Sequence, residues 1–112
     1  MEIIKDKINQ DKLKEIALGG YKEMVKVAVD TEKGILAAGG EFHADCLEKL
    51  VENGSEPNNI WGANIYLDKT KEDRVEFIAL INIRPVLNNR SMEIQDEEIK
   101  EKIKNIIDKL VE

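Results

Sequence analysis

The sequence has 112 residues, of which 42% are hydrophobic, 4% aromatic and 36% charged, and its formal charge is −6. This composition indicates one globular domain, spanning residues 1–112, with an aliphatic core. The negative charge argues against a protein that binds nucleic acid through phosphate contacts, and the single cysteine excludes an intramolecular disulfide and a cysteine-based zinc site.

The chain is expected to begin with a short lead-in and a helix. Residues 1–5 read as a short strand or as an extended lead-in. Residues 9–20 are predicted to form a helix with Asn9 or Asp11 as its cap. The pair Gly19–Gly20 is predicted to end this helix, because glycine accepts the left-handed conformation found past a helix end.

A hairpin and a second helix are expected next. Apolar side chains alternate in "MVKVAVD", and "DTEKG" suits a tight turn with Gly34 in a left-handed position, so residues 24–40 are predicted to form a β-hairpin. Residues 43–54 then follow a helical period, and Gly54 is predicted to close the helix. The residues predicted to face inward from this helix are Cys46, Leu47, Leu50 and Val51.

The second half repeats the order of hairpin and helix. "IWGANIYLD" alternates between two faces, and "RVEFIALINIR" is predicted to be the longest strand, which gives a second hairpin at roughly 61–84. Residues 96–111 are predicted to form a helix capped by Asp96. Its apolar stripe consists of Ile99, Ile103, Ile106, Ile107 and Leu110. The sequence therefore predicts an α+β fold, a four-stranded, mainly antiparallel sheet with three helices chiefly on one face.

The stretch "INIRPVLNNR" gathers polar residues at the end of the predicted longest strand. Strand alternation places Asn82 and Arg84 together on the face opposite Ile81 and Ile83, and Pro85 should end the strand. Asparagine and arginine side chains at such a loop suit the recognition of an anion or an amide. The alternative is that the arginines pair with carboxylates and the asparagines make turns. The residues predicted to bind a ligand are Asn82, Arg84, Asn89 and Arg90, together with Trp61 and Asn64 from the preceding strand and Glu41.

His43, the only histidine, is the second candidate for chemistry. It lies two residues from both Glu41 and Asp45, and its ordinary pKa suits a general base. The three side chains could hold a metal ion only weakly, so no metal site and no cofactor are predicted. The alternative is a histidine that serves the loop or the helix start.

Two further residues carry open alternatives. Trp61 is predicted to pack in the core or as a lid over the sheet, and the other interpretation makes it a stacking platform for a ligand. Cys46 is predicted to be a small core residue rather than a nucleophile.

Several short motifs together resemble a family of small uncharacterised prokaryotic proteins, a domain of unknown function. They occur in order along nearly the whole chain: "GGEFHAD", "GS" at 54–55, "WGANIY", "INIRP" and "NRS". The resemblance implies a compact prokaryotic domain without an assigned activity. The matching positions are Gly40, Glu41, His43, Asp45, Trp61, Gly62, Asn64, Tyr66, Asn82, Arg84, Pro85, Asn89 and Arg90.

The chain departs from the family pattern in two places. Leu67 stands where relatives often have proline, and Ile78-Ala79-Leu80 replaces a more polar run. If that run helps to build a site, the site is reduced here.

Two functional hypotheses follow. The first is a cytoplasmic ligand-binding or interaction domain that holds a small anionic or amide-bearing ligand or peptide through the arginine and asparagine cluster. The second is a small hydrolase in which His43 is the general base, Asp45 or Glu41 orients it, and Arg84 and Arg90 clamp an anion. The two hypotheses differ in whether His43 must lie within a side chain's reach of Arg84. A further hypothesis places Arg84, Arg90 and at least one of His43, Glu41 and Asp45 in one pocket. No apolar run is long enough for a membrane span and the N-terminus carries no targeting pattern, while self-association stays open.

Overall fold

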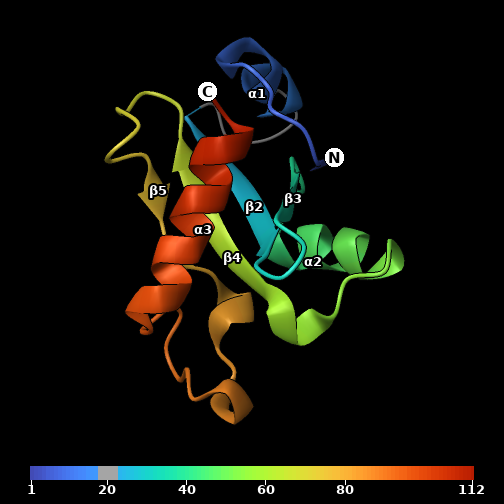
Figure 1. Cartoon of the computed structure of the whole chain (residues 1–112), viewed down its shortest axis with the longest axis vertical. Helices are drawn as coiled ribbons and strands as arrows, with labels where there is room; N and C mark the ends of the chain where they lie inside the picture. The colour runs from blue at the N-terminus through green and yellow to red at the C-terminus, as the bar shows by residue number, and fades with distance from the viewer. Residues whose placement is uncertain (18–22) are drawn as a thin grey trace.

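A five-stranded antiparallel sheet forms the centre of the computed structural model, which describes residues 1–17 and 23–112 (Figure 1). The strands follow the order β1-β3-β2-β4-β5 across the sheet. Their bounds are Glu2–Ile4 for β1, Met24–Asp30 for β2, Ile35–Ala38 for β3, Ile60–Tyr66 for β4 and Val75–Glu76 for β5. The predicted α+β class is confirmed, and the segment 1–5 supplies a fifth strand that the four-stranded prediction did not include.

The first hairpin is confirmed in position and turn. Strands β2 and β3 pair antiparallel, with Asp30 opposite Ile35. Asp30 Oδ1 accepts the backbone N–H groups of Glu32 and Lys33, each at 2.9 Å, and Gly34 adopts a φ of 68°. The carboxylate thus stabilises the turn, and glycine allows the left-handed backbone that closes it.

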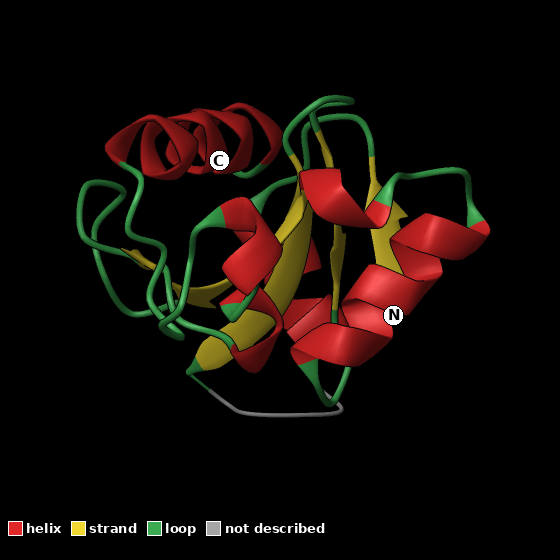
Figure 2. Ribbon diagram, turned by 90° about the horizontal axis from the view of Figure 1, so that it is seen from below, coloured by secondary structure: helices red, strands yellow, loops and turns green. Residues whose placement is uncertain are grey.

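The three helices cover both faces of the sheet. They are α1 (Gln10–Ala17), α2 (His43–Glu52) and α3 (Glu97–Leu110). Residues of α1 and α3 join one core cluster with Val27 and Trp61, and α3 crosses the strands on that face (Figures 1 and 2). Helix α2 packs on the opposite face, where Cys46 and Leu50 meet Ala28 and Ile60. Two of the three helices therefore share a face, and α2 forms a layer of its own.

The helix ends agree with the predicted caps where the structure describes them. Asn9 Oδ1 accepts the backbone N–H of Lys12 at 2.8 Å, so Asn9 rather than Asp11 caps α1. Asp96 accepts the N–H groups of Glu98 and Ile99 at the start of α3. The predicted stop at Gly19–Gly20 lies outside the described residues.

The inward faces of α2 and α3 are largely as predicted. The apolar stripe of α3 is confirmed, because Ile103, Ile107 and Leu110 are buried and the other two isoleucines pack against the same cluster. In α2, Cys46 and Leu50 are buried, whereas Val51 is exposed, so its predicted inward position is wrong.

Arg74 joins the sheet to the end of α3. Its side chain is 2% exposed and donates to the backbone oxygens of Val111 and Glu112, each at 2.8 Å, and to Asp108 at 3.3 Å. Backbone carbonyls at a helix end lack helical partners, so a guanidinium placed there satisfies them and favours the negative end of the helix dipole. Sequence reasoning did not single out this arginine.

The predicted long strand over 74–84 is wrong beyond Glu76. The chain makes one isolated bridge, between Ile78 and Glu93, and then a 3-10 turn, η2 (Leu80–Asn82). A Cβ on Gly62 would lie only 2.5 Å from the Cβ of Ala79, so the glycine is what allows this segment to cross the α2 face of the sheet. The absence of a side chain at Gly62 thus leaves room for the segment after Glu76 to cross the sheet, although the apolar pattern of that segment suits a strand.

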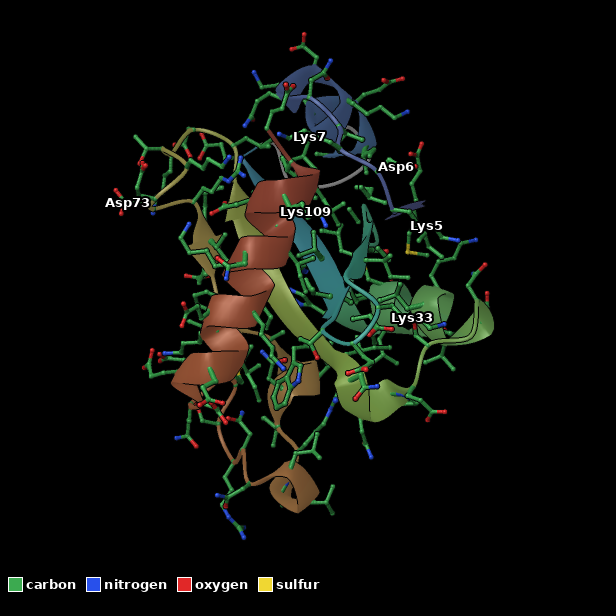
Figure 3. The ribbon with its side chains drawn as sticks, in the orientation of Figure 1. Lys5, Asp6, Lys7, Lys33, Asp73 and Lys109 are labelled. Atoms are coloured by element: carbon green, nitrogen blue, oxygen red, sulfur yellow. The ribbon has the colours of Figure 1, made fainter. Side chains whose placement is uncertain are left out.

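Most charged side chains lie on the periphery, and Asp30 and Arg74 are buried exceptions. Lys5, Asp73 and Lys109, labelled in Figure 3, are exposed. Within residues 1–17 and 23–112, no helix combines the length and the apolar character that a membrane crossing requires.

Candidate functional site

A cleft of about 420 Å³ lies on the α2 face of the sheet. One wall is the start of α2, with Phe42, His43 and Ala44, and the other is the segment that crosses over Gly62. The floor includes Lys26 and Asn64 from the sheet. The apolar lining residues are Met24, Phe42, Ala44, Ile78, Ala79, Leu80, Ile81 and Met92. Ligand pockets in proteins usually have this size and this mixture of apolar walls with a few polar groups.

Three exposed apolar side chains surround the cleft. Phe42 is 58% exposed, Leu80 is 70% exposed and Met92 is 41% exposed, and all three line the cavity. Because large apolar side chains gathered around a hollow mark binding surfaces, this region is the best candidate for contact with another molecule. Ile78, Ala79 and Leu80, where the sequence departs from the resembled pattern, supply part of the apolar wall.

A row of polar side chains crosses the sheet below the cleft. Lys26 of β2 lies opposite Asn64 of β4, which in turn lies opposite Glu76 of β5. Residues directly opposite each other in an antiparallel sheet point to the same face, so the three side chains share the α2 face. Asn64 Nδ2 donates to Glu76 Oε1 at 2.9 Å, and the hydroxyl of Tyr66 donates to the same oxygen at 3.0 Å.

His43 is the first residue of α2 and reaches down to this row. Its Nε2 lies 2.7 Å from Asn64 Oδ1 and 3.1 Å from the backbone oxygen of Ala63. The hydrogen bonds of His43 therefore go to Asn64 and Ala63, and not to Glu41 or Asp45, which the hydrolase hypothesis expected to orient it.

The protonation of His43 follows from its surroundings. Burial lowers its pKa below the ordinary value of 6.5, and the positive charge of Lys26 lowers it further, while the hydrogen bonds to Asn64 and Ala63 act in the opposite direction. The net effect is a lowered pKa, so the imidazole is neutral at pH 7.

The segment before α2 is held by other contacts. Asp45 Oδ2 accepts the backbone N–H of Phe42 at 3.0 Å, which satisfies a donor at the helix start. Lys26 Nζ donates to the backbone oxygen of Glu41 at 2.9 Å and lies 5.4 Å from the ring centre of Phe42. Asp45 is thus a capping residue of α2, and Lys26 holds the loop that precedes His43 by its hydrogen bond to Glu41. Sequence reasoning missed both Lys26 and Glu76 as site residues.

Arg84 contacts the opposite side of the sheet. Its guanidinium carbon lies 5.3 Å from the ring centre of Trp61, and the side chain donates to the backbone oxygens of Ile81 and Pro57 at 2.9 and 2.8 Å. Trp61 is 3% exposed and belongs to the core beneath α3, so its predicted core position is confirmed. Arg90 is exposed.

Asn82 and Asn89 of the predicted cluster are buried and make several hydrogen bonds to the backbone. Asn82 accepts the N–H of Gly62 at 2.8 Å and donates to the oxygen of the same residue at 3.0 Å. Asn89 donates to the oxygens of Asn82, Ser91 and Glu93. The amide of Asn82 therefore pairs with β4 as a neighbouring strand would, at the point where β5 has already ended.

The predicted common pocket of the arginines and the 41–45 segment is absent from the two hollows that described residues of this segment line. The cleft that His43 lines contains neither Arg84 nor Arg90, and neither arginine lines the hollow of about 210 Å³ beside Glu41 and Asp45. The reason is geometric, since Arg84 packs on Trp61 of the α3-face core while His43 bonds Asn64 on the α2 face. Within the described ranges, no group of three or more histidine, cysteine, aspartate or glutamate residues could hold a metal ion.

Cys46 lies between α2 and the sheet, in the core cluster that contains Ala28 and Ile60. It is fully buried, and burial raises the pKa of its thiol above the ordinary value. A buried thiol in its neutral form is a poor nucleophile, in agreement with the predicted core role.

Comparison with known proteins assigns the chain to a family but gives no activity. Residues 2–110 match a family model described as "Protein of unknown function (DUF5674)". Neither the curated proteins nor the solved structures include a match. The match spans nearly the whole chain and agrees with the resemblance carried by its motifs, and the chain therefore belongs to the DUF5674 family of proteins of unknown function.

Proposed function

We propose that this protein is a small-molecule-binding domain whose ligand occupies the cleft between the start of α2 and the segment 78–81. The observation that carries the proposal is the combination of a cavity of about 420 Å³, apolar walls, and one histidine whose hydrogen bonds fix it to the floor. A preformed hollow of this kind desolvates an apolar ligand, and a few fixed polar groups set its orientation.

The cleft is a better candidate than the arginine and asparagine cluster. The amides of Asn82 and Asn89 already bond to backbone groups, and Arg84 donates to two backbone oxygens and covers Trp61. A ligand would have to compete with these bonds. In the cleft, by contrast, the apolar side chains of Phe42 and Leu80 are exposed and gain from being covered.

Binding can be tested by titrating ¹⁵N-labelled protein with indole and following the backbone amide resonances. The proposal predicts saturable shifts at residues 42–44 and 78–81. Leu80→Ala should weaken binding by a factor of about three to ten, since it removes part of a wall. Val86→Ala is the matched control, because Val86 is an equally apolar, 88% exposed side chain outside the cleft. Shifts spread evenly over the surface, or equal effects of the two variants, would contradict the proposal.

A second candidate function is hydrolysis, with His43 as general base. The observation in its favour is that a neutral imidazole held at Nε2 by Asn64 and Ala63 presents its other nitrogen as a proton acceptor. That nitrogen would take a proton from the attacking water. Hydrolysis of p-nitrophenyl acetate should then rise with pH through the pKa of His43 and disappear in His43→Phe. A rate equal to that of buffer at every pH would exclude this candidate.

A further inference from the structure

We propose that the ligand of the cleft is a neutral, largely apolar molecule with an N–H or O–H group that donates a hydrogen bond to Nδ1 of His43. This inference rests on the proposed small-molecule-binding function and adds the chemical class of the ligand. It depends on which ring nitrogen carries the proton, which the surrounding hydrogen bonds determine.

The orientation of Asn64 comes first. Its Nδ2 faces Glu76 Oε1 at 2.9 Å and the backbone oxygen of Ile78 at 3.1 Å. Both are oxygen acceptors, so the nitrogen of the amide must lie on that side and the oxygen on the side of His43. Glu76 is held in turn by the hydroxyl of Tyr66, which donates to the same carboxylate oxygen. The side-chain oxygen of Asn64 therefore faces the imidazole.

The tautomer of His43 follows. Nε2 lies between Asn64 Oδ1 and the backbone oxygen of Ala63, and neither atom can donate. The proton of the neutral ring must therefore be on Nε2, and Nδ1 carries a lone pair. The backbone oxygen of Ala63 can only accept a hydrogen bond, and the orientation of Asn64 places its oxygen toward the ring, so two independent contacts determine this tautomer.

Nδ1 is available to a ligand. It makes no hydrogen bond to any residue in the described ranges 1–17 and 23–112, and His43 is only partly buried and lines the cleft. The polar atoms of Asn64 are already paired with His43, Glu76 and Ile78. A ligand in this apolar cleft consequently meets an acceptor at His43, and a donor on the ligand is the complementary group.

The charges around the site favour a neutral donor. Lys26 of β2 lines the cleft, and its positive charge opposes a second cation beside His43. Asp45 on α2 is turned to the N–H of Phe42, and Glu76 of β5 is turned to Asn64 and Tyr66. An anionic ligand would meet the lone pair of Nδ1, which disfavours it unless the ring is protonated.

Indole and benzofuran provide a matched pair of probes, since they share a ring shape and differ in an N–H donor against an oxygen acceptor. At pH 8, indole should bind roughly fivefold more tightly than benzofuran, as expected for one net hydrogen bond. This preference should vanish as the pH falls below the pKa of His43, because the protonated Nδ1 no longer accepts. Benzofuran binding should not weaken over the same range.

The single histidine also gives a direct spectroscopic readout. Long-range ¹⁵N–¹H correlation spectra of the imidazole should show the Nε2–H tautomer in the free protein at pH 8. Indole should shift the unprotonated Nδ1 resonance and leave the tautomer unchanged, and benzofuran should not shift it. These measurements use the unmodified chain, so they do not depend on whether a variant folds.

Two variants separate the ligand chemistry from the cleft itself. His43→Phe keeps a ring at this position and should reduce indole binding to the level of benzofuran. Leu80→Ala should weaken both probes by the same factor. Equal binding of indole and benzofuran to the unmodified protein, still weakened by Leu80→Ala, would overturn the donor inference and leave the cleft as a binding site. If neither probe shifts the cleft resonances at millimolar concentration, both proposals fail. A free protein with the Nδ1–H tautomer, or tighter binding of benzoate than of indole at pH 8, would also overturn the inference.

Discussion

The side-chain amide of Asn82 is expected to be one of the largest single contributors to stability outside the aliphatic core. It is fully buried and makes three hydrogen bonds, to the N–H of Gly62 at 2.8 Å, to the oxygen of Gly62 at 3.0 Å and to the oxygen of Met92 at 3.2 Å. Replacement by alanine removes all three. The two backbone groups of Gly62 belong to a buried residue at the point where β5 no longer pairs with β4, and they would lose these partners.

The expected cost follows from those orphaned groups. A buried donor or acceptor without a partner costs about 1–3 kcal/mol, so the two groups of Gly62 alone suggest about 2–6 kcal/mol. A water that enters the space left by the side chain would recover part of this, which favours about 3–5 kcal/mol. Small domains unfold with a free energy of about 5–15 kcal/mol, so the variant should be clearly less stable and still measurable.

Urea unfolding followed by circular dichroism measures this loss as a lower midpoint. Asn58→Ala is the matched control, since Asn58 is exposed and should change stability by less than about 0.5 kcal/mol. Asn82→Asp gives a second test because it keeps the acceptor for the N–H of Gly62 but sets a carboxylate against two carbonyl oxygens. Its loss should exceed that of alanine at pH 7 and shrink as the pH falls toward about 4. A cost below about 1 kcal/mol for Asn82→Ala would refute the strand-like role of this amide.

Three further predictions concern the sheet, α3 and the histidine. Gly62→Ala places a methyl group 2.5 Å from the Cβ of Ala79, so it should cost about 1–3 kcal/mol in urea and also weaken indole binding; unchanged binding would show that the crossing segment does not shape the cleft. Ile103→Ala, in a side chain with 0% exposure, should cost about 2–4 kcal/mol, and a loss below about 1 kcal/mol would make α3 peripheral. Because the pKa of His43 is lowered on folding, the unfolded chain binds more protons than the folded chain below about pH 6.5, and the free energy of unfolding should fall as the pH drops below that value. His43→Phe should lose this part of the pH dependence, which urea midpoints at pH 5 and pH 7.5 would measure.

The elements that could be predicted from the sequence are those that depend on local patterns. The hairpin at 24–40 has alternating valines, a capping aspartate and a glycine at the left-handed position, and each acts within a few residues. The stripe of α3 repeats at the helical period, and Asp96 sits directly before it. These signals need no knowledge of distant residues.

The errors come from contacts between distant parts of the chain. The run from Val75 to Ile83 has the composition of a strand, but Gly62 leaves room for it to cross the sheet and Asn82 pairs with the exposed edge of β4. Once the strand ends at Glu76, the alternation used to place Arg84 beside Asn82 no longer applies. Arg84 instead covers Trp61.

The row of polar side chains beneath the cleft shows which site residues could have been predicted from the sequence. The predicted alternation already put Asn64 on the face opposite Trp61. Pairing β4 with β2 on one side and with β5 on the other would have set a polar residue of each beside Asn64. Lys26 and Glu76 are those residues, and each is a charged side chain within an apolar strand. The register was needed to join them, and it depends on the whole sheet rather than on any one segment. His43 is more distant still, because its place over Asn64 depends on α2 packing against the opposite face from α1 and α3. The chemistry of the site, a histidine with its proton fixed on Nε2, therefore arises from side chains of three elements, α2, β4 and β5, and from backbone oxygens beside them.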